Sequence, residues 1–170
     1  PSRSTVFGIY LHYGESSGFW INLAVQSLAT LWLLQLTLRV LSMMQTFRFV
    51  AISLLLILST ALPWLASMLL TDIFAGLSVL SLFLLVVSGP RTSALEKISL
   101  FVFTAFAAAT HSATLGLLLG LCIAGWMARP LLGPRLPIAG LAQASLTILA
   151  GGLMLVSANH ALSGKWTWTP

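Results

Sequence analysis

Long apolar runs separated by short polar segments dominate this sequence. The longest run, residues 95–126, is interrupted only by Glu96, Lys97 and the group Thr110-His111-Ser112. Hydrophobic residues make up 58% of the chain, charged residues only 6%, and the mean hydropathy is +1.01. Soluble domains carry roughly a quarter charged residues, so this chain cannot cover a water-facing surface. In hydrocarbon each segment must satisfy its own backbone hydrogen bonds as a helix. We therefore expect an all-α fold, a polytopic transmembrane bundle of about six short helices.

The breaks between apolar runs predict where these helices begin and end. We expect spans at residues 19–41, 49–62, 71–87 and 138–157, and two helices of about 15 residues on either side of His111. Pro63 interrupts the second span because it lacks a donor and disfavours helix at the residue before it. A 15-residue helix reaches about 22 Å, short of the roughly 30 Å hydrocarbon core. We therefore expect the junction at His111 to lie below the membrane surface.

The chain is expected to form one membrane domain, residues 1–170, cut from a longer protein. It opens without an initiator Met and without a basic segment typical of a signal peptide. Residues 1–18 are expected to be an outer-face loop, residues 19–157 the helix bundle and residues 158–170 an outer-face tail. The single cysteine, Cys122, excludes a disulfide framework or a cysteine metal site.

The positive charges predict the orientation in the membrane. One set of alternate connections carries six of the eight cations: Arg39, Arg48, Arg91, Lys97, Arg129 and Arg135. Because positive residues favour the cytoplasmic side, both chain ends are expected on the outer face, of a bacterial cytoplasmic membrane. The cations are scattered singly, which excludes a nucleic-acid partner and leaves membrane lipids as the expected surroundings.

Asp72 is the first candidate for chemistry. It follows Thr71 at the start of a predicted helix, where either side chain could cap the exposed amides. Alternatively, Asp72 is a carboxylate in an outer cavity that acts as a base or as a ligand of a divalent metal ion. An ionisable group in the membrane needs a cavity or a partner, because its insertion costs about 2.5 to 3.5 kcal/mol.

Four further residues are candidates for binding. His111 is either a packing histidine or, beside the amides of the helix that starts at Ser112, part of a phosphate site. Arg3 and Ser4 could likewise hold a phosphate. Asn159 is expected on the same outer side of the membrane as these residues. No Ser-His-Asp spacing, phosphate-cradling glycine loop, metal-ligand cluster or nucleotide motif is present.

Four short features resemble the GT-C superfamily, the polytopic glycosyltransferases that use polyprenyl-phosphate sugars. Residues 3–8, Arg-Ser-Thr-Val-Phe-Gly, are similar to the Arg-Ser-Pro-Leu-Tyr-Gly stretch of many bacterial members. Asp72 is similar in place to the second outer acidic residue of the family, and Thr110-His111-Ser112 to its Thr-Lys-Gly-Pro. The residues from Asn159 onward resemble the segment that leaves the membrane. The first acidic residue of the family would lie upstream of Pro1.

The resemblance implies sugar transfer at the outer membrane face, with a metal ion used by some relatives. In that case Asp72 would orient the acceptor or a metal, while His111 and Arg3 would hold the phosphate leaving group. Two other functions remain open from the residues alone: a transporter or flippase for a lipid or small solute, and a scaffold subunit without chemistry of its own.

Overall fold

The fold was analysed in a computed structural model that describes residues 4–164 and 166–167. This part of the chain contains eight α-helices, two short 3₁₀ turns and no strand, which confirms the all-α prediction. The elements are α1 (Thr5–Glu15), α2 (Trp20–Val40), α3 (Thr46–Ser59), α4 (Leu62–Ser67), α5 (Asp72–Val87), η1 (Gly89–Arg91), α6 (Ala94–Thr110), α7 (Ser112–Leu132), η2 (Gly133–Arg135) and α8 (Ile138–Ser163).

Three segments of the described chain are long and apolar enough to cross a membrane. They are Trp20–Val40, Ser112–Arg135 and Ile138–Ser163, of 21, 24 and 26 residues. Helices α3 and α5 are apolar but shorter. The protein is therefore a membrane protein, built from full-length and shorter helices together.

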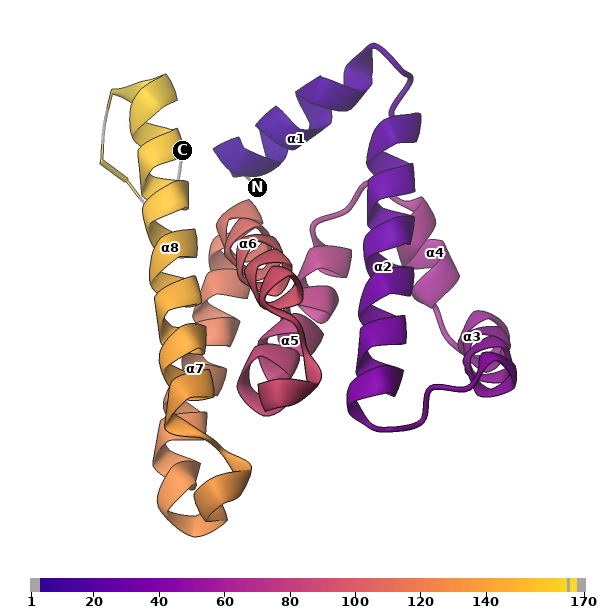
Figure 1. The fold of residues 1–170 in the computed structure, drawn as a ribbon. Coiled ribbons are helices and arrows are strands. Elements are labelled where there is room, and N and C mark those ends of the chain that lie inside the picture. Colours follow the sequence, from indigo (N-terminus) through magenta and orange to yellow (C-terminus); the bar gives the residue numbers. More distant parts are fainter. Residues whose placement is uncertain (1–3, 165, 168–170) are drawn as a thin grey trace.

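The bundle packs around α6. Helices α5 and α8 make the most extensive contacts with it, and α7 also lies against α8 (Figure 1). Gly151 of α8 sits directly on α6, where an added Cβ would lie 2.7 Å from the Cβ of Ala108. Small residues thus let the two backbones approach closely, as in other membrane helix pairs.

The predicted helix breaks are found in the structure. His111 is the single residue between α6 and α7, with an extended backbone at φ −157° and ψ 129°. Asp72 opens α5, and Pro63 lies in the first turn of α4, where its missing N–H leaves no hydrogen bond unmade. The expected connector after Pro63 is therefore partly helical.

Three expected boundaries are corrected. The segment expected as a loop, residues 1–18, contains α1, whose apolar side packs on the bundle. Helix α7 has 21 residues instead of about 15, because Pro130 falls in its last turn and removes only one donor. It is long enough to cross a membrane, so the expectation that helix length places the His111 junction below the membrane surface does not hold for α7. Helix α8 continues to Ser163, so the expected outer-face tail begins within it.

The cations that were counted for orientation gather at one end of the bundle. Figure 1 shows the α2–α3, α5–α6 and α7–α8 connections at the end opposite α1; we name these the arginine end and the α1 end. At the arginine end Arg39 of α2 forms an ion pair with Glu96 of α6. Arg91 Nη1 donates to the carbonyl oxygen of Val40 at 2.6 Å. These contacts fasten α2 to α6 and to the loop that precedes it.

Candidate functional site

Helix α1 lies across one end of the bundle (Figure 1). The Ser4 hydroxyl accepts a hydrogen bond from the Phe7 amide at 3.4 Å, which caps α1, and donates to the Ala109 carbonyl oxygen at 2.7 Å. Val6 packs with Ala109 of α6 and Leu155 of α8 in one buried cluster. The α1 start is therefore fixed against the end of α6, two residues before His111.

His111 lies half-buried between two helices that end and begin beside α1. Its side chain forms no cap hydrogen bond to α7 and no ion pair within the described chain. The preceding Thr110 is buried and donates to the Ala107 carbonyl oxygen at 2.7 Å. The first-turn amides of α7 therefore have no side-chain cap, which is the arrangement that favours an anion at a helix N-terminus.

Asn159 belongs to the same neighbourhood, through α8. It follows Leu155 by one helical turn and is fully buried, at 0% exposure. Its Nδ2 donates to the Thr167 carbonyl oxygen at 2.8 Å, whereas its Oδ1 has no partner within the described chain. Asn159 thus holds the chain after α8 against the bundle and keeps one buried acceptor free.

Asp72 is the first residue of α5, a helix that also packs against α1. Two residues later, Phe74 packs against Phe7 and Tyr10 of α1, with ring centroids 6.4 and 5.6 Å away. The Asp72 side chain is exposed and has no hydrogen-bond or ion-pair partner among residues 4–164 and 166–167. The predicted cap is not formed, because neither Thr71 nor Asp72 bonds a first-turn amide through its side chain.

Helix α1 thus links the helices that carry the predicted residues, whereas no hydrogen bond, ion pair or shared pocket joins Asp72, His111 and Asn159 to one another in the described chain. Helix α1 contacts the helix that begins at Asp72, the helix that ends at His111 and the helix that carries Asn159. Ser4 is tied to this junction directly, whereas Arg3 lies outside the described residues. Among the residues described, no three His, Cys, Asp or Glu side chains gather closely enough to hold a metal ion.

Two buried amides that the sequence analysis did not single out hold the α1 end together. Asn22 Nδ2 donates to the Tyr10 carbonyl oxygen at 2.6 Å, and the Tyr10 hydroxyl donates to the Asn22 carbonyl oxygen at 2.7 Å. One turn later, Gln26 Nε2 donates to the carbonyl oxygen of Met68 at 3.0 Å. The spacing of Asn22, Gln26 and Thr30 inside an apolar span was the available signal, because polar residues in membrane helices face the protein interior.

Tyr10 is shielded by this arrangement. Burial raises the pKa of Tyr10 to about 12, against a smaller lowering of the pKa by its hydrogen bond to Asn22. Tyr10 therefore stays protonated at any physiological pH and acts as a hydrogen-bond donor that joins α1 to α2.

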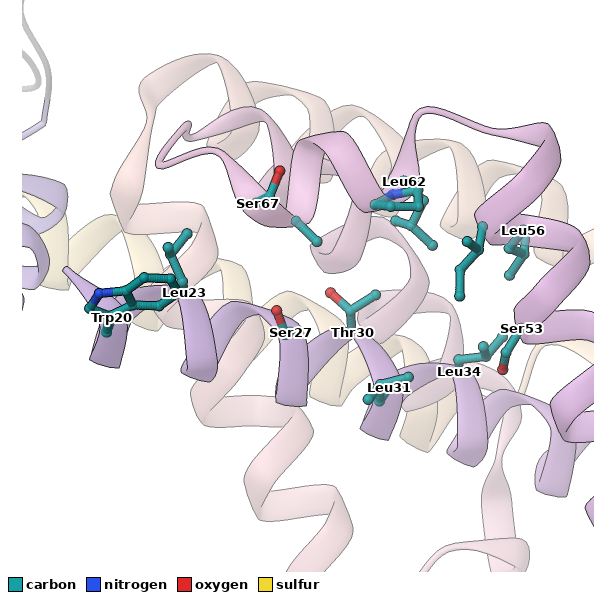
Figure 2. Close-up of a pocket in the computed structure, with 13 residues that line it drawn as sticks. Trp20, Leu23, Ser27, Thr30, Leu31, Leu34, Ser53, Leu56, Leu62 and Ser67 are labelled. Atoms are coloured by element: carbon teal, nitrogen blue, oxygen red, sulfur yellow. The ribbon is translucent and has the colours of Figure 1, made fainter.

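A separate groove of about 400 Å³ lies between α2, α3 and α4. Figure 2 shows Trp20, Leu23, Leu31 and Leu34 along α2, facing Leu56 of α3 and Leu62 of α4. None of Asp72, His111 and Asn159 lines it. The groove is thus a different feature from the α1 end, and its lining is suited to an apolar occupant.

Comparison with known proteins does not assign the chain. No protein-family model, no curated protein and no solved structure matches it.

Proposed function

We propose that this chain is part of a membrane glycosyltransferase that moves a sugar from a polyprenyl-phosphate donor to an acceptor. The reaction would take place at the α1 end, on the outer face of a bacterial cytoplasmic membrane. The observation that carries the proposal is the hydrogen bond from Ser4 to Ala109. It ties the segment that resembles a phosphate-contacting motif to the helix end before His111, the second candidate for that phosphate.

The chemistry follows from where charge develops. The acceptor hydroxyl oxygen forms a bond to the anomeric carbon of the sugar, and the bond from that carbon to the phosphate oxygen breaks. Polyprenyl phosphate leaves with the bonding electron pair, so its negative charge grows in the transition state. His111 and the uncapped amides of α7 would stabilise that charge.

Asp72 would accept the proton that the acceptor hydroxyl loses. The carboxylate is suited to this role because it is exposed and has no partner among the described residues. A bound divalent ion is compatible with an unpaired carboxylate, but among the described residues Asp72 belongs to no group of three His, Cys, Asp or Glu side chains.

The test is sugar transfer from a polyprenyl-phosphate donor by the full-length protein. Asp72→Asn should lower the turnover about a hundredfold or more, as expected for loss of a general base. His111→Ala should lower turnover through loss of leaving-group stabilisation. The matched controls are Glu15→Gln and His12→Ala, because these exposed residues pair with each other on α1 at 3.3 Å. Unchanged turnover in both site variants would refute the proposal.

A second candidate function is lipid or solute transport, and one observation favours it. The chain breaks between α3 and α4 at residues 60–61, and Gln26 holds the end of α4 while its own Oε1 stays unpartnered within the described chain. Broken helices beside buried polar groups are typical of transporters. Protein-dependent movement of a fluorescent lipid across vesicles, without sugar transfer, would favour this function over the first.

A further inference from the structure

Helix α3 is the least anchored helix of the bundle. None of its residues is buried, and Phe47 and Leu58 are 83% and 82% exposed. Figure 1 shows it apart from the other long helices and turned end-on to the view. Between helices in lipid there is no hydrophobic driving force, so a gap closes only where side chains interlock or another apolar group fills it.

The space that α3 leaves against α2 and α4 has the chemistry of a hydrocarbon site. Of its four hydroxyls, two are used within their own helices: Thr30 Oγ1 donates to the Gln26 carbonyl oxygen and Ser67 Oγ to the Trp64 carbonyl oxygen, both at 2.8 Å. A third, Ser53 Oγ, is buried and has no hydrogen-bond partner within the described chain. Leucines make up much of the remaining wall (Figure 2). The groove opens toward the α1 end at Trp20, which is 74% exposed and is the kind of side chain found at a membrane interface.

The charges near the N-terminal end of α3 indicate which kind of lipid the groove binds. Of the three arginines nearest the α2–α3 connection, Arg39 is paired with Glu96 and Arg91 is bonded to the Val40 carbonyl oxygen. Arg48, in the first turn of α3, is exposed and has no such partner within the described residues. Arg48 is not itself a lining residue of the groove. It lies in the first turn of α3, directly after the α2–α3 connection and about one and a half turns before Ser53, which lines the groove. A cation in this position attracts the phosphate of an anionic lipid.

We propose that the groove between α2, α3 and α4 binds one acyl chain of an anionic bilayer phospholipid from the leaflet at the arginine end. The phosphate of that lipid contacts Arg48, and its chain extends along α2 past Leu34 and Leu31 toward Trp20. The bound chain supplies the packing that holds α3 on the bundle. This site does not depend on the proposed sugar transfer.

The experiment is photo-crosslinking of the full-length protein in vesicles, with a phospholipid that carries a diazirine in its acyl chain. Phosphatidylglycerol and phosphatidylcholine versions are compared, and crosslinked peptides are identified by mass spectrometry. We expect crosslinks to concentrate on residues 23–34 and 53–67, with severalfold more from phosphatidylglycerol.

Two pairs of variants separate the groove from general lipid contact. Leu31→Trp fills the groove and should reduce crosslinking severalfold, whereas Leu28→Trp, on an exposed part of α2 outside the groove, should not. Arg48→Gln should remove the preference for phosphatidylglycerol, whereas Arg135→Gln, an exposed arginine in η2, should keep it. If Leu31→Trp fails to fold, Leu56→Trp on α3 fills the groove from the opposite side and takes its place in the comparison.

Three outcomes would overturn the proposal. The first is even crosslinking over all lipid-facing helices, unaffected by Leu31→Trp and Leu56→Trp. The second is a phosphatidylglycerol preference that survives Arg48→Gln. The third comes from a parallel experiment with a bifunctional protein crosslinker: crosslinks between two copies of the chain across the groove would show that a second copy occupies it.

Discussion

The Ser4 hydroxyl donates a 2.7 Å hydrogen bond to the carbonyl oxygen of Ala109, a residue 105 positions further along the chain. The acceptor belongs to the last turns of α6, whose carbonyl groups have no partner within the helix itself. One side chain therefore caps α1, satisfies a carbonyl group of α6 and brings the two segments together beside His111. The first prediction tests this contact.

Ser4→Ala should lower the free energy of unfolding by about 1–2 kcal/mol, because it removes an N-cap and a buried hydrogen bond. Reversible unfolding in bicelles measures the change. Ser99→Ala on α6 is the control, since the Ser99 side chain has no hydrogen-bond partner among the residues described. An equal effect of the two substitutions would contradict the role of Ser4.

Gly14 and Gly8 of α1 should respond to alanine with opposite signs. A Cβ on Gly14 would overlap the Asn22 amide group, whereas a Cβ on Gly8 meets nothing within 4 Å. Gly14→Ala should therefore lower the free energy of unfolding by about 1–3 kcal/mol, because the added methyl group displaces α1. Gly8→Ala should stabilise α1 by about 0.5–1 kcal/mol. The same unfolding assay measures both, and a loss from Gly8→Ala as large as that from Gly14→Ala would refute the explanation.

Tyr10 should make the protein less stable in strong alkali. Its pKa is about 12 in the folded protein and 10.0 in an unperturbed tyrosine, so the folded state holds the proton more tightly. Below pH 10 both states are protonated and the group contributes no pH dependence. As the pH rises from about 10 to 12, the unfolded state loses the proton first and the free energy of unfolding falls. Phenolate absorbance should report the titration of Tyr10, and unfolding measured over the same pH range should report the loss of stability. Tyr10→Phe should remove the part of this loss that Tyr10 causes. A free energy of unfolding that stays constant from pH 10 to 12 would contradict the raised pKa.

The ion pair between Arg39 and Glu96 should contribute little to stability. Their side chains are 46% and 23% exposed, so water and salt screen the interaction. A double-mutant cycle with Arg39→Gln and Glu96→Gln should give a coupling of less than about 1 kcal/mol, and less still at high salt. A coupling of several kcal/mol that salt does not change would show that the pair is shielded from solvent.

Features that depend on neighbouring residues were predicted well. The division of the run at residues 95–126 was placed at His111, and the third helix was placed at Asp72. Both predictions rest on local chemistry, because a polar group interrupts an apolar run and an acidic residue favours the first turn of a helix. The interruption near Pro63 was expected at Leu62 to Trp64, but the structure breaks at residues 60–61 and places Pro63 in the first turn of α4.

Helix α1 shows where such reasoning stops. Val6, Phe7, Tyr10 and Leu11 are spaced three and four residues apart, as on one face of a helix, yet the segment was expected to be a loop. An isolated helix of 11 residues is marginal in water. It forms here because Phe7 is fully buried against Phe74 and Tyr10 is bonded to Asn22. These partners lie on other helices and could not be read from the segment itself.

The sequence by itself determined that the protein is helical and resides in a membrane, where its chain breaks, and which connections carry its cations. These properties follow from the length of apolar runs and from single polar residues within them. Only the tertiary structure decided that Ser4 meets Ala109, that Asp72 has no partner in the described chain, and that α3 leaves a groove beside α2. Each of these depends on contacts between residues far apart in the chain, and in a membrane such contacts are selected by the fit of side chains, because nearly every surface is equally apolar.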